Sequence, residues 1–207
     1  MDNFNKAYLD SLNSNDVENR LEGLISKYEN KEDVTKTDLI ELLKIAIVDE
    51  MLAEYNYFAS YNLSKTSGKS DFDPEFEQHE DEERDHRKML VNRLRELDVE
   101  VPTILLSDFF NYNSNGGSWK QELSSDSSKI LLNRYNEELN AIKYYDLILK
   151  VIHNLKKQGE FDSTTQQIIK KIKADEETHA KDLKDLLIEH NILGLHDDKH
   201  EDEENEI

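Results

Sequence analysis

The sequence contains no cysteine, only two prolines and only six glycines among its 207 residues. Without cysteine, the chain has no structural disulfide, no thiolate zinc site and no iron–sulfur cluster held by cysteine. Proline and glycine interrupt helices, so their scarcity in a chain rich in Leu, Ile, Lys and Glu predicts an all-α fold. No apolar run approaches the ~20 residues that a membrane-spanning helix needs.

Basic residues are also few, because 26 Lys and Arg stand against 46 Asp and Glu, for a formal net charge of -20. A surface this negative repels nucleic acid and anionic membranes and attracts cations. The stretch from Met1 to Lys6 has no basic region followed by an apolar one, so no signal peptide is expected. We therefore expect a cytoplasmic protein that binds neither nucleic acid nor membrane.

Four long segments repeat apolar residues in alternating steps of three and four, which is the spacing of helices that pack in a bundle. Each predicts a helix about 40 Å long at 1.5 Å per residue. The predicted helices run from Thr35 or Thr37 to about Leu63, from Pro74 to about Asp98, from near Asp126 to about Asn154, and from a cap at Ser163 or Thr164 to about His190.

The links between these helices predict the topology. Short links join the first helix to the second and the third to the fourth, so each pair should be antiparallel. The 27-residue segment 99–125 is long enough to run the length of the bundle, which would make the second and third helices parallel neighbours. We therefore expect a four-helix bundle at 35–191 with one long crossover between helices 2 and 3. An N-terminal extension with a short peripheral helix (1–34) and an acidic, mobile tail (192–207) would flank it.

Two Glu-x-x-His motifs lie within the second and fourth predicted helices, at Glu83–His86 and Glu176–His179. Residues three apart project from the same side of a helix, and in both motifs that side continues as apolar residues. The first and third helices each place one glutamate, Glu50 and Glu138, on an otherwise non-acidic inner stripe. Charged groups on a core-facing stripe need compensation, and a metal ion supplies it.

The two halves of the chain also match each other. Glu50-x-x-Ala-x-x-x-Tyr57 in the first helix has the same spacing as Glu138-x-x-Ala-x-x-x-Tyr145 in the third. Two helix pairs, each supplying Glu and then Glu-x-x-His, predict a site with approximate two-fold symmetry. Four carboxylates nearly cancel the charge of two divalent cations, and a set of oxygen and imidazole ligands without thiols suits iron or manganese.

Over about residues 37–190, these motifs resemble the ferritin-like superfamily of dinuclear carboxylate proteins, which includes bacterioferritins, Dps-like proteins and rubrerythrins. The resemblance covers Glu50-Met-Leu-Ala-Glu-Tyr-Asn-Tyr-Phe, Glu83-Arg-Asp-His86 and the exit Val101-Pro102-Thr103. It implies that Glu83 and Glu176 bridge two irons, that Glu50 with His86 completes one iron, and that Glu138 with His179 completes the other. It also implies that Tyr57 and Tyr145 hydrogen-bond to the ligand carboxylates.

The sequence departs from these relatives in ways that remove electron-transfer parts. Bacterioferritin haem is held by a methionine directly after the bridging glutamate of the second helix, where this chain has Arg84, so no haem is expected. The cysteine-rich rubredoxin domain of rubrerythrins and the cysteine pair of some Dps-like proteins are also absent. Both absences disfavour a rubredoxin-type peroxidase cycle.

Three functions remain open on the sequence alone. The first is iron storage or detoxification, in which Fe(II) is oxidised by O2 or H2O2 inside a homo-oligomeric shell. The second is a non-storage di-iron or di-manganese enzyme, such as a peroxidase, catalase or hydroxylase. The third is a metal-free helical interaction module.

For several further polar residues we expect an ordinary structural or solvated role and not a role in the metal site. His79 lies on the inner stripe one turn before Glu83, and an ordinary hydrogen-bonded histidine is favoured over an accessory or entry site for metal. His196 and His200 are expected in a solvated tail. Five other glutamates are expected to be outer or flanking charges: Glu54, Glu80, Glu82, Glu137 and Glu177.

Overall fold

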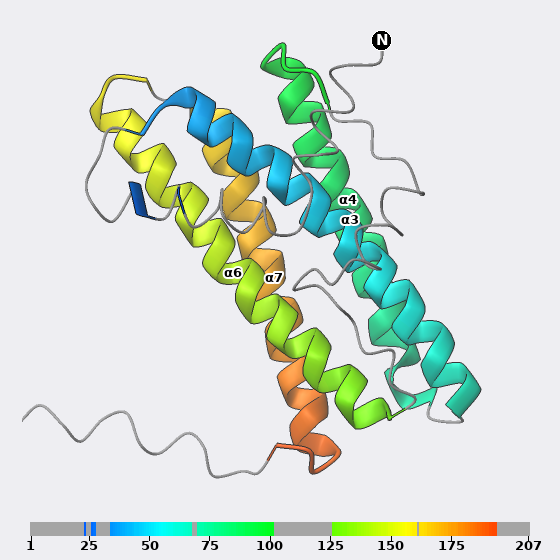
Figure 1. The fold of residues 1–207 in the computed structure, drawn as a ribbon. Helices are drawn as coiled ribbons and strands as arrows, with labels where there is room; N and C mark the ends of the chain where they lie inside the picture. Colours follow the sequence, from blue (N-terminus) through cyan, green and yellow to red (C-terminus); the bar gives the residue numbers. More distant parts are fainter. Residues whose placement is uncertain are drawn as a thin grey trace, which may run out of the picture.

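The computed structural model describes residue 23 and residues 26–27, 34–67, 70–101, 126–160 and 162–193. Within these residues all regular secondary structure is helical, and no strand is present. The four long helices are α3 (Lys36–Ser67), α4 (Asp73–Glu96), α6 (Ser127–Lys157) and α7 (Ser163–Glu189), and the short 3-10 helix η1 (Ser70–Phe72) lies between α3 and α4. The all-α prediction is confirmed, and Figure 1 shows the four helices side by side.

Side chains that accept hydrogen bonds from free backbone N–H groups explain where the helices begin. Thr35 and Asp38 bond to each other across the first turn of α3, in the reciprocal pattern of a capping box. Asp126 accepts from the N–H of Ser128 at the start of α6. The start of α7 differs from the prediction, because Asp162 accepts from the N–H groups of the next turn and is the cap in place of Ser163 or Thr164.

Three of the helices are followed by a residue in the left-handed backbone region, which turns the chain away from the helix axis. These residues are Asp98 after α4, Gly159 after α6 and Asn191 after α7, with φ values of 56°, 82° and 57°. Glycine adopts this conformation without strain, and Asp and Asn tolerate it better than other side chains do. The turns keep the link from α6 to α7 short, so that these two helices are antiparallel.

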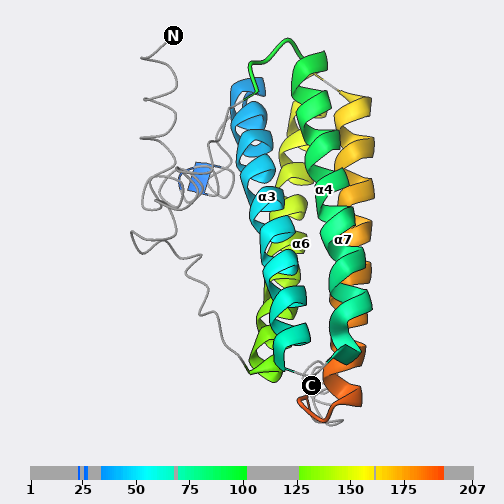
Figure 2. The same cartoon turned by 90° about the vertical axis from the view of Figure 1, so that its right-hand side faces the viewer.

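The direction of the four helices agrees with a long crossover. In Figure 2, α3 and α7 run downward while α4 and α6 run upward, so the chain must return the length of the bundle between α4 and α6. The predicted crossover falls on residues 102–125, which lie outside the described ranges. One expectation was wrong: α3 packs against α4 and α6, and α7 packs against α6 and α4, so the parallel helices α4 and α6 are diagonal and not neighbours.

The hydrophobic core is divided in two along the bundle. One part, which we call the large cluster, lies where α3 and α7 begin and includes Leu43, Leu94, Ile152 and Ile172. The other part, the small cluster, lies where α4 and α6 begin and consists of Tyr57, Phe72, Phe76, Ile130, Leu131, Leu183 and Leu187. Between the two clusters lie buried polar residues from all four helices, and these form the candidate site.

The remaining expectations about chain organisation fall largely on residues that the structure does not describe. Most of the N-terminal extension and the tail from residue 194 onward lie outside the described ranges. Lys27 is described, and its Nζ lies 2.6 Å from Oδ2 of Asp38 at the start of α3. In the part of the chain that is described, no helix is both long enough and apolar enough to cross a membrane.

Candidate metal centre

The structure brings the six predicted ligand residues together at mid-height in the bundle. Their side chains converge because each lies near the middle of a helix and on its inward side. We call this group the Glu–His cluster: Glu50 from α3, Glu83 and His86 from α4, Glu138 from α6, and Glu176 and His179 from α7. Each of the six is at most 3% exposed. Ionisable groups buried this deeply require compensation by opposite charge or by metal.

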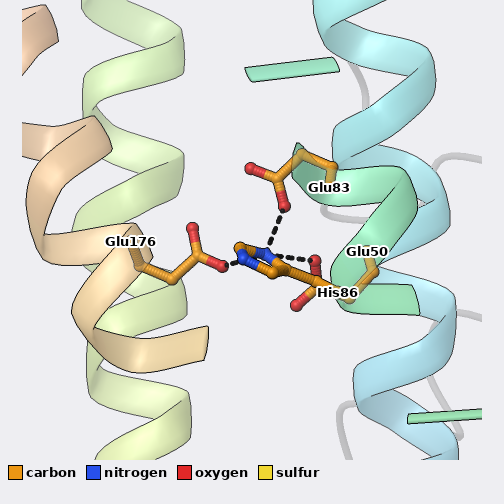
Figure 3. A group of neighbouring side chains, drawn as sticks. All are labelled: Glu50, Glu83, His86 and Glu176. Carbon is orange, nitrogen blue, oxygen red and sulfur yellow. Dashed lines mark hydrogen bonds and ion pairs between the residues drawn. The ribbon is translucent and has the colours of Figure 1, made fainter. Parts of the chain in front are cut away.

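The cluster consists of two overlapping groups of four residues. In the first, Nδ1 of His86 lies 3.3 Å from Glu50, 3.3 Å from Glu83 and 3.0 Å from Glu176. Figure 3 shows these three carboxylates pointing at the imidazole from α3, α4 and α7. The ligand atoms of the group all lie within 4.8 Å of one another.

The second group repeats this arrangement around His179. Its Nδ1 lies 3.2 Å from Glu83, 3.3 Å from Glu176 and 3.7 Å from Glu138. Glu83 and Glu176 therefore belong to both groups, whereas Glu50 and Glu138 each belong to one. Two adjacent sites that share two carboxylates have the layout of a dinuclear centre with two bridging ligands.

Two tyrosines hold the unshared glutamates, as the resemblance implied. The hydroxyl of Tyr57 on α3 donates to Glu138 on α6, and the hydroxyl of Tyr145 on α6 donates to Glu50 on α3. Burial, together with the nearby carboxylates, raises the pKa of both tyrosines well above the usual value. Both hydroxyls therefore stay protonated and act as donors, which fixes the orientation of the carboxylates across the α3–α6 interface.

Two acidic residues orient the histidines, and the sequence interpretation missed both. Nε2 of His86 lies 3.1 Å from Asp175 on α7, and Nε2 of His179 lies 2.6 Å from Glu82 on α4. A carboxylate on one ring nitrogen keeps the proton there and leaves the other nitrogen, here Nδ1, free to bind a metal. Glu82 is therefore not merely a flanking charge. The signal was present in the sequence, because an acidic residue directly precedes both Glu83 and Glu176.

The electrostatics show how poorly the cluster is balanced without a cation. Burial and the charges of Glu176 and Glu50 raise the pKa of Glu83 well above its usual value, and burial with the charge of Glu176 raises that of Glu138 to about 7. Burial alone would lower the pKa values of His86 and His179, but the surrounding carboxylates raise both. The carboxylates repel each other and draw protons onto their neighbours, and divalent cations can replace those protons.

Buried atoms without a hydrogen bond within the cluster point to the same conclusion. Among the described residues, Glu50 Oε2, Glu83 Oε1, Glu176 Oε1 and His179 Nδ1 are buried without a hydrogen-bond partner. Buried polar atoms are normally hydrogen-bonded, so four exceptions in one place require an explanation. Each is an oxygen or imidazole nitrogen in one of the two groups, and such donors suit iron and manganese. The residues present therefore fit a pair of divalent metal ions.

The other glutamates surround the cluster as structural charges. Glu54 pairs with Arg84 and Arg87 across the α3–α4 interface. Glu137 pairs with Arg134, which is 1% exposed. Glu80 and Glu177 complete the set, paired with Arg84 and Lys173 on their own helices.

His79 is not the ordinary hydrogen-bonded histidine that was expected. It is completely buried, and neither of its ring nitrogens forms a hydrogen bond within the part of the chain that the structure describes. Its ring stacks on His179 with 4.0 Å between centroids and meets the edge of Tyr57 at 5.0 Å. Burial, with the adjacent His179, lowers the pKa of His79 to about 3, so its ring is neutral at ordinary pH.

Comparison with known proteins agrees with this architecture. A family model described as the ferritin-like domain matches residues 40–191. The solved structure of a dodecameric thioferritin from Bacteroides fragilis, a bacterioferritin-related protein, superposes with a TM-score of 0.63 at 29% sequence identity. The match covers 77% of this chain and 89% of that protein. A search of curated proteins gave no match.

Proposed function

Because this chain belongs to the ferritin-like domain family, we propose that it oxidises Fe(II) with oxygen or hydrogen peroxide at a dinuclear iron site and thereby stores or detoxifies iron. The observation that carries the proposal is the pair of overlapping groups that share Glu83 and Glu176. The iron ligands that we propose are the six residues of the Glu–His cluster. Manganese suits the same ligands, so iron is the proposed metal and manganese the variant to test.

The side chains of the cluster perform distinct tasks in this proposal. Glu83 and Glu176 would hold both ions, Glu50 and His86 would complete the ligands of one, and Glu138 and His179 would complete those of the other. Two ferrous ions bound there would together supply two electrons to one oxidant molecule. Tyr57 and Tyr145 hold the terminal carboxylates in place, and Asp175 and Glu82 keep the histidine protons on Nε2.

The storage role draws its support from the thioferritin of Bacteroides fragilis, which is a dodecamer. We propose that this chain also forms a homo-oligomeric shell that encloses oxidised iron. The net charge of -20 fits the collection of cations. Light scattering coupled to gel filtration tests this role, with 12 or 24 copies expected. A monomer or dimer would leave no cavity and would favour the non-storage di-iron or di-manganese enzyme.

The metal site has its own test, which does not depend on assembly. Anaerobic titration of the metal-free protein with Fe(II) should load the paired site, and Glu176→Ala should lose both of its ions because Glu176 contributes to both. The adjacent Glu177 is the matched control, since its side chain is 53% exposed and pairs with Lys173. Glu177→Ala should bind iron as the unaltered chain does. Retention of both paired ions in Glu176→Ala would refute the assigned bridge.

A further inference from the structure

Three polar side chains beside the Glu–His cluster form a separate group. They are Glu75 and His79, one turn apart on α4, and Asp182 on α7. Their ligand atoms all lie within 4.8 Å of one another, which is close to twice the roughly 2.1 Å bond to a divalent ion. None of the three belongs to the six residues already assigned. A small closing movement of the two flexible carboxylates brings all three onto one ion.

The buried histidine is the observation that points to a ligand. His79 is 0% exposed, and its Nε2 lies 3.2 Å from Glu75 Oε1 in a geometry that does not make a hydrogen bond. Within the described residues, its Nδ1 also has no partner. An imidazole buried with neither nitrogen hydrogen-bonded lowers the stability of the fold, so such a residue persists where a ligand satisfies it.

The other half of the bundle provides an internal comparison. The two halves correspond with Glu50 matched to Glu138 and Glu83 matched to Glu176. Under that correspondence, the positions equivalent to Glu75, His79 and Asp182 are Ile168, Ile172 and Met89. All three belong to the large cluster or pack against it. An apolar trio thus closes one side of the centre, while a polar trio replaces it on the other side.

The polar trio also spans the distance from solvent to the centre. The side chains of Glu75 and Asp182 are 28% and 32% exposed, whereas those of Glu83 and Glu176 are 2% exposed. His79 is completely buried, belongs to the same group as the two partly exposed carboxylates, and stacks directly on His179. A cation held by the two outer carboxylates and by His79 therefore contacts water on one side and the Glu–His cluster on the other.

We propose that Glu75, His79 and Asp182 bind a third divalent cation and that this site loads Fe(II) from solvent into the paired site. The ion has one imidazole and two carboxylate ligands, so water completes its coordination and it exchanges readily. The existence of the third site is independent of the function proposed above, whereas its loading role rests on that function.

Cobalt(II) is a suitable probe, because it resists oxidation in air and binds the same nitrogen and oxygen donors. Equilibrium dialysis of the full metal-free chain against Co(II), followed by metal analysis, should give one ion per chain more than the same measurement on His79→Ile. Isoleucine is the residue at the equivalent position of the other half, so the variant has a packing precedent within the chain. Asp182→Asn, which alters a partly exposed residue, should weaken the binding of the third ion on the order of 10–100-fold.

Asp185→Asn is the matched control, because Asp185 lies one turn further along α7 with its side chain 62% exposed and outside the trio. It should bind as many ions as the unaltered chain. Equal binding by the unaltered chain, His79→Ile and Asp182→Asn would overturn the third site while leaving the paired site intact. Conversely, Glu176→Ala should lose the paired ions and keep the third, which separates failure of one proposal from failure of the other.

The loading role predicts a kinetic effect without a change in the paired site at equilibrium. Rapid mixing with Co(II), followed by the visible absorption of the bound ion, should show slower filling of the paired site in Asp182→Asn, with the same final occupancy. An unchanged filling rate would remove the loading role. An altered final occupancy of the paired site would show that Asp182 acts on the paired ligands instead.

Discussion

The two ends of this bundle lie on either side of the Glu–His cluster. They differ from each other far more than the two halves of the cluster do. Among the residues that the structure describes, the large cluster contains sixteen buried hydrophobic residues and the small cluster contains seven. At the end with the small cluster, buried polar side chains take the remaining space, including His79, Arg134, Asp73 and Ser64. The first two replace Ile172 and Ala46 at the equivalent positions of the other half.

This difference shows how a nearly symmetric repeat can have two ends of different polarity. The residues that touch the cluster are symmetric: each half supplies a tyrosine, a histidine and an acid that orients the opposite histidine. One turn away the symmetry ends. The apolar end supplies most of the hydrophobic burial that stabilises the fold, and the polar end provides the approach to the centre.

The largest expected effect concerns the Glu–His cluster, which lies between the two ends. Addition of Fe(II) or Mn(II) to the metal-free chain should raise its free energy of unfolding, because the ions bind only the folded state. Each site contributes about 2.7 kcal/mol at a free metal concentration of 100 times its dissociation constant. Denaturant melts with and without a chelator measure the effect. Melting that ignores the chelator would favour a metal-free interaction module.

The difference between the two ends can be reduced by Ile172→His. This substitution introduces, at the apolar end, the residue that the polar end has at the equivalent position. Ile172 is completely buried. The change loses about 1.5–3 kcal/mol of apolar burial and adds about 1–3 kcal/mol for an unpaired imidazole, so we expect a loss of roughly 3–5 kcal/mol. Chemical denaturation of the metal-free protein measures it. Ile172→Val is the control and should cost only about 0.5–1.5 kcal/mol.

The reverse exchange, His79→Ile, should stabilise the metal-free protein by about 1–3 kcal/mol, because it removes an unpaired buried imidazole. The opposite signs of the two exchanges would show that His79 costs stability where it lies. A clear loss of stability in His79→Ile would show instead that the imidazole is already satisfied, and the argument for a ligand at that position would fail.

Sequence periodicity predicted the fold well for physical reasons that are visible in the structure. Apolar residues three and four apart, as in Leu90 and Leu94, are buried because they face one side of a helix. The adjacency of α4 and α6 was mispredicted, because a link long enough to cross the bundle is long enough to reach either a neighbouring helix or a diagonal one. Link length alone does not distinguish the two.

The candidate site shows the same division between local and tertiary information. Glu83 and His86 are three apart on one helix, so their shared direction follows from helix geometry. The contact of Glu82 with His179 joins α4 to α7 and depends on how the helices are rotated against each other, which periodicity does not specify to one residue. The missing hydrogen bonds of His79 are likewise a property of its surroundings, and its position on the inner stripe revealed only that it is buried.

The smallest expected effect compares the helix starts at the two ends. Asp162 begins α7 at the end with the large cluster, where it accepts from the N–H groups of Thr164 and Thr165, from the Thr165 hydroxyl and from Arg93 of α4. Asp126 begins α6 at the other end and accepts from the N–H of Ser128. We expect Asp162→Ala to cost about 1–2 kcal/mol and Asp126→Ala about 0.5–1 kcal/mol, within the range measured for helix caps.

The difference should depend on pH in a defined direction. Burial would raise the pKa of Asp162, but its hydrogen bonds with Thr165 and Arg93 hold it below the usual value. A group whose pKa is lowered by folding contributes stability above its unfolded pKa, about 3.9, and loses that contribution as the pH falls through the lower folded value. Denaturant melts of the unaltered chain and of Asp162→Asn should therefore differ at pH 6 and converge in acid. A constant difference would mean that the Asp162 carboxylate contributes through its shape and not through its charge.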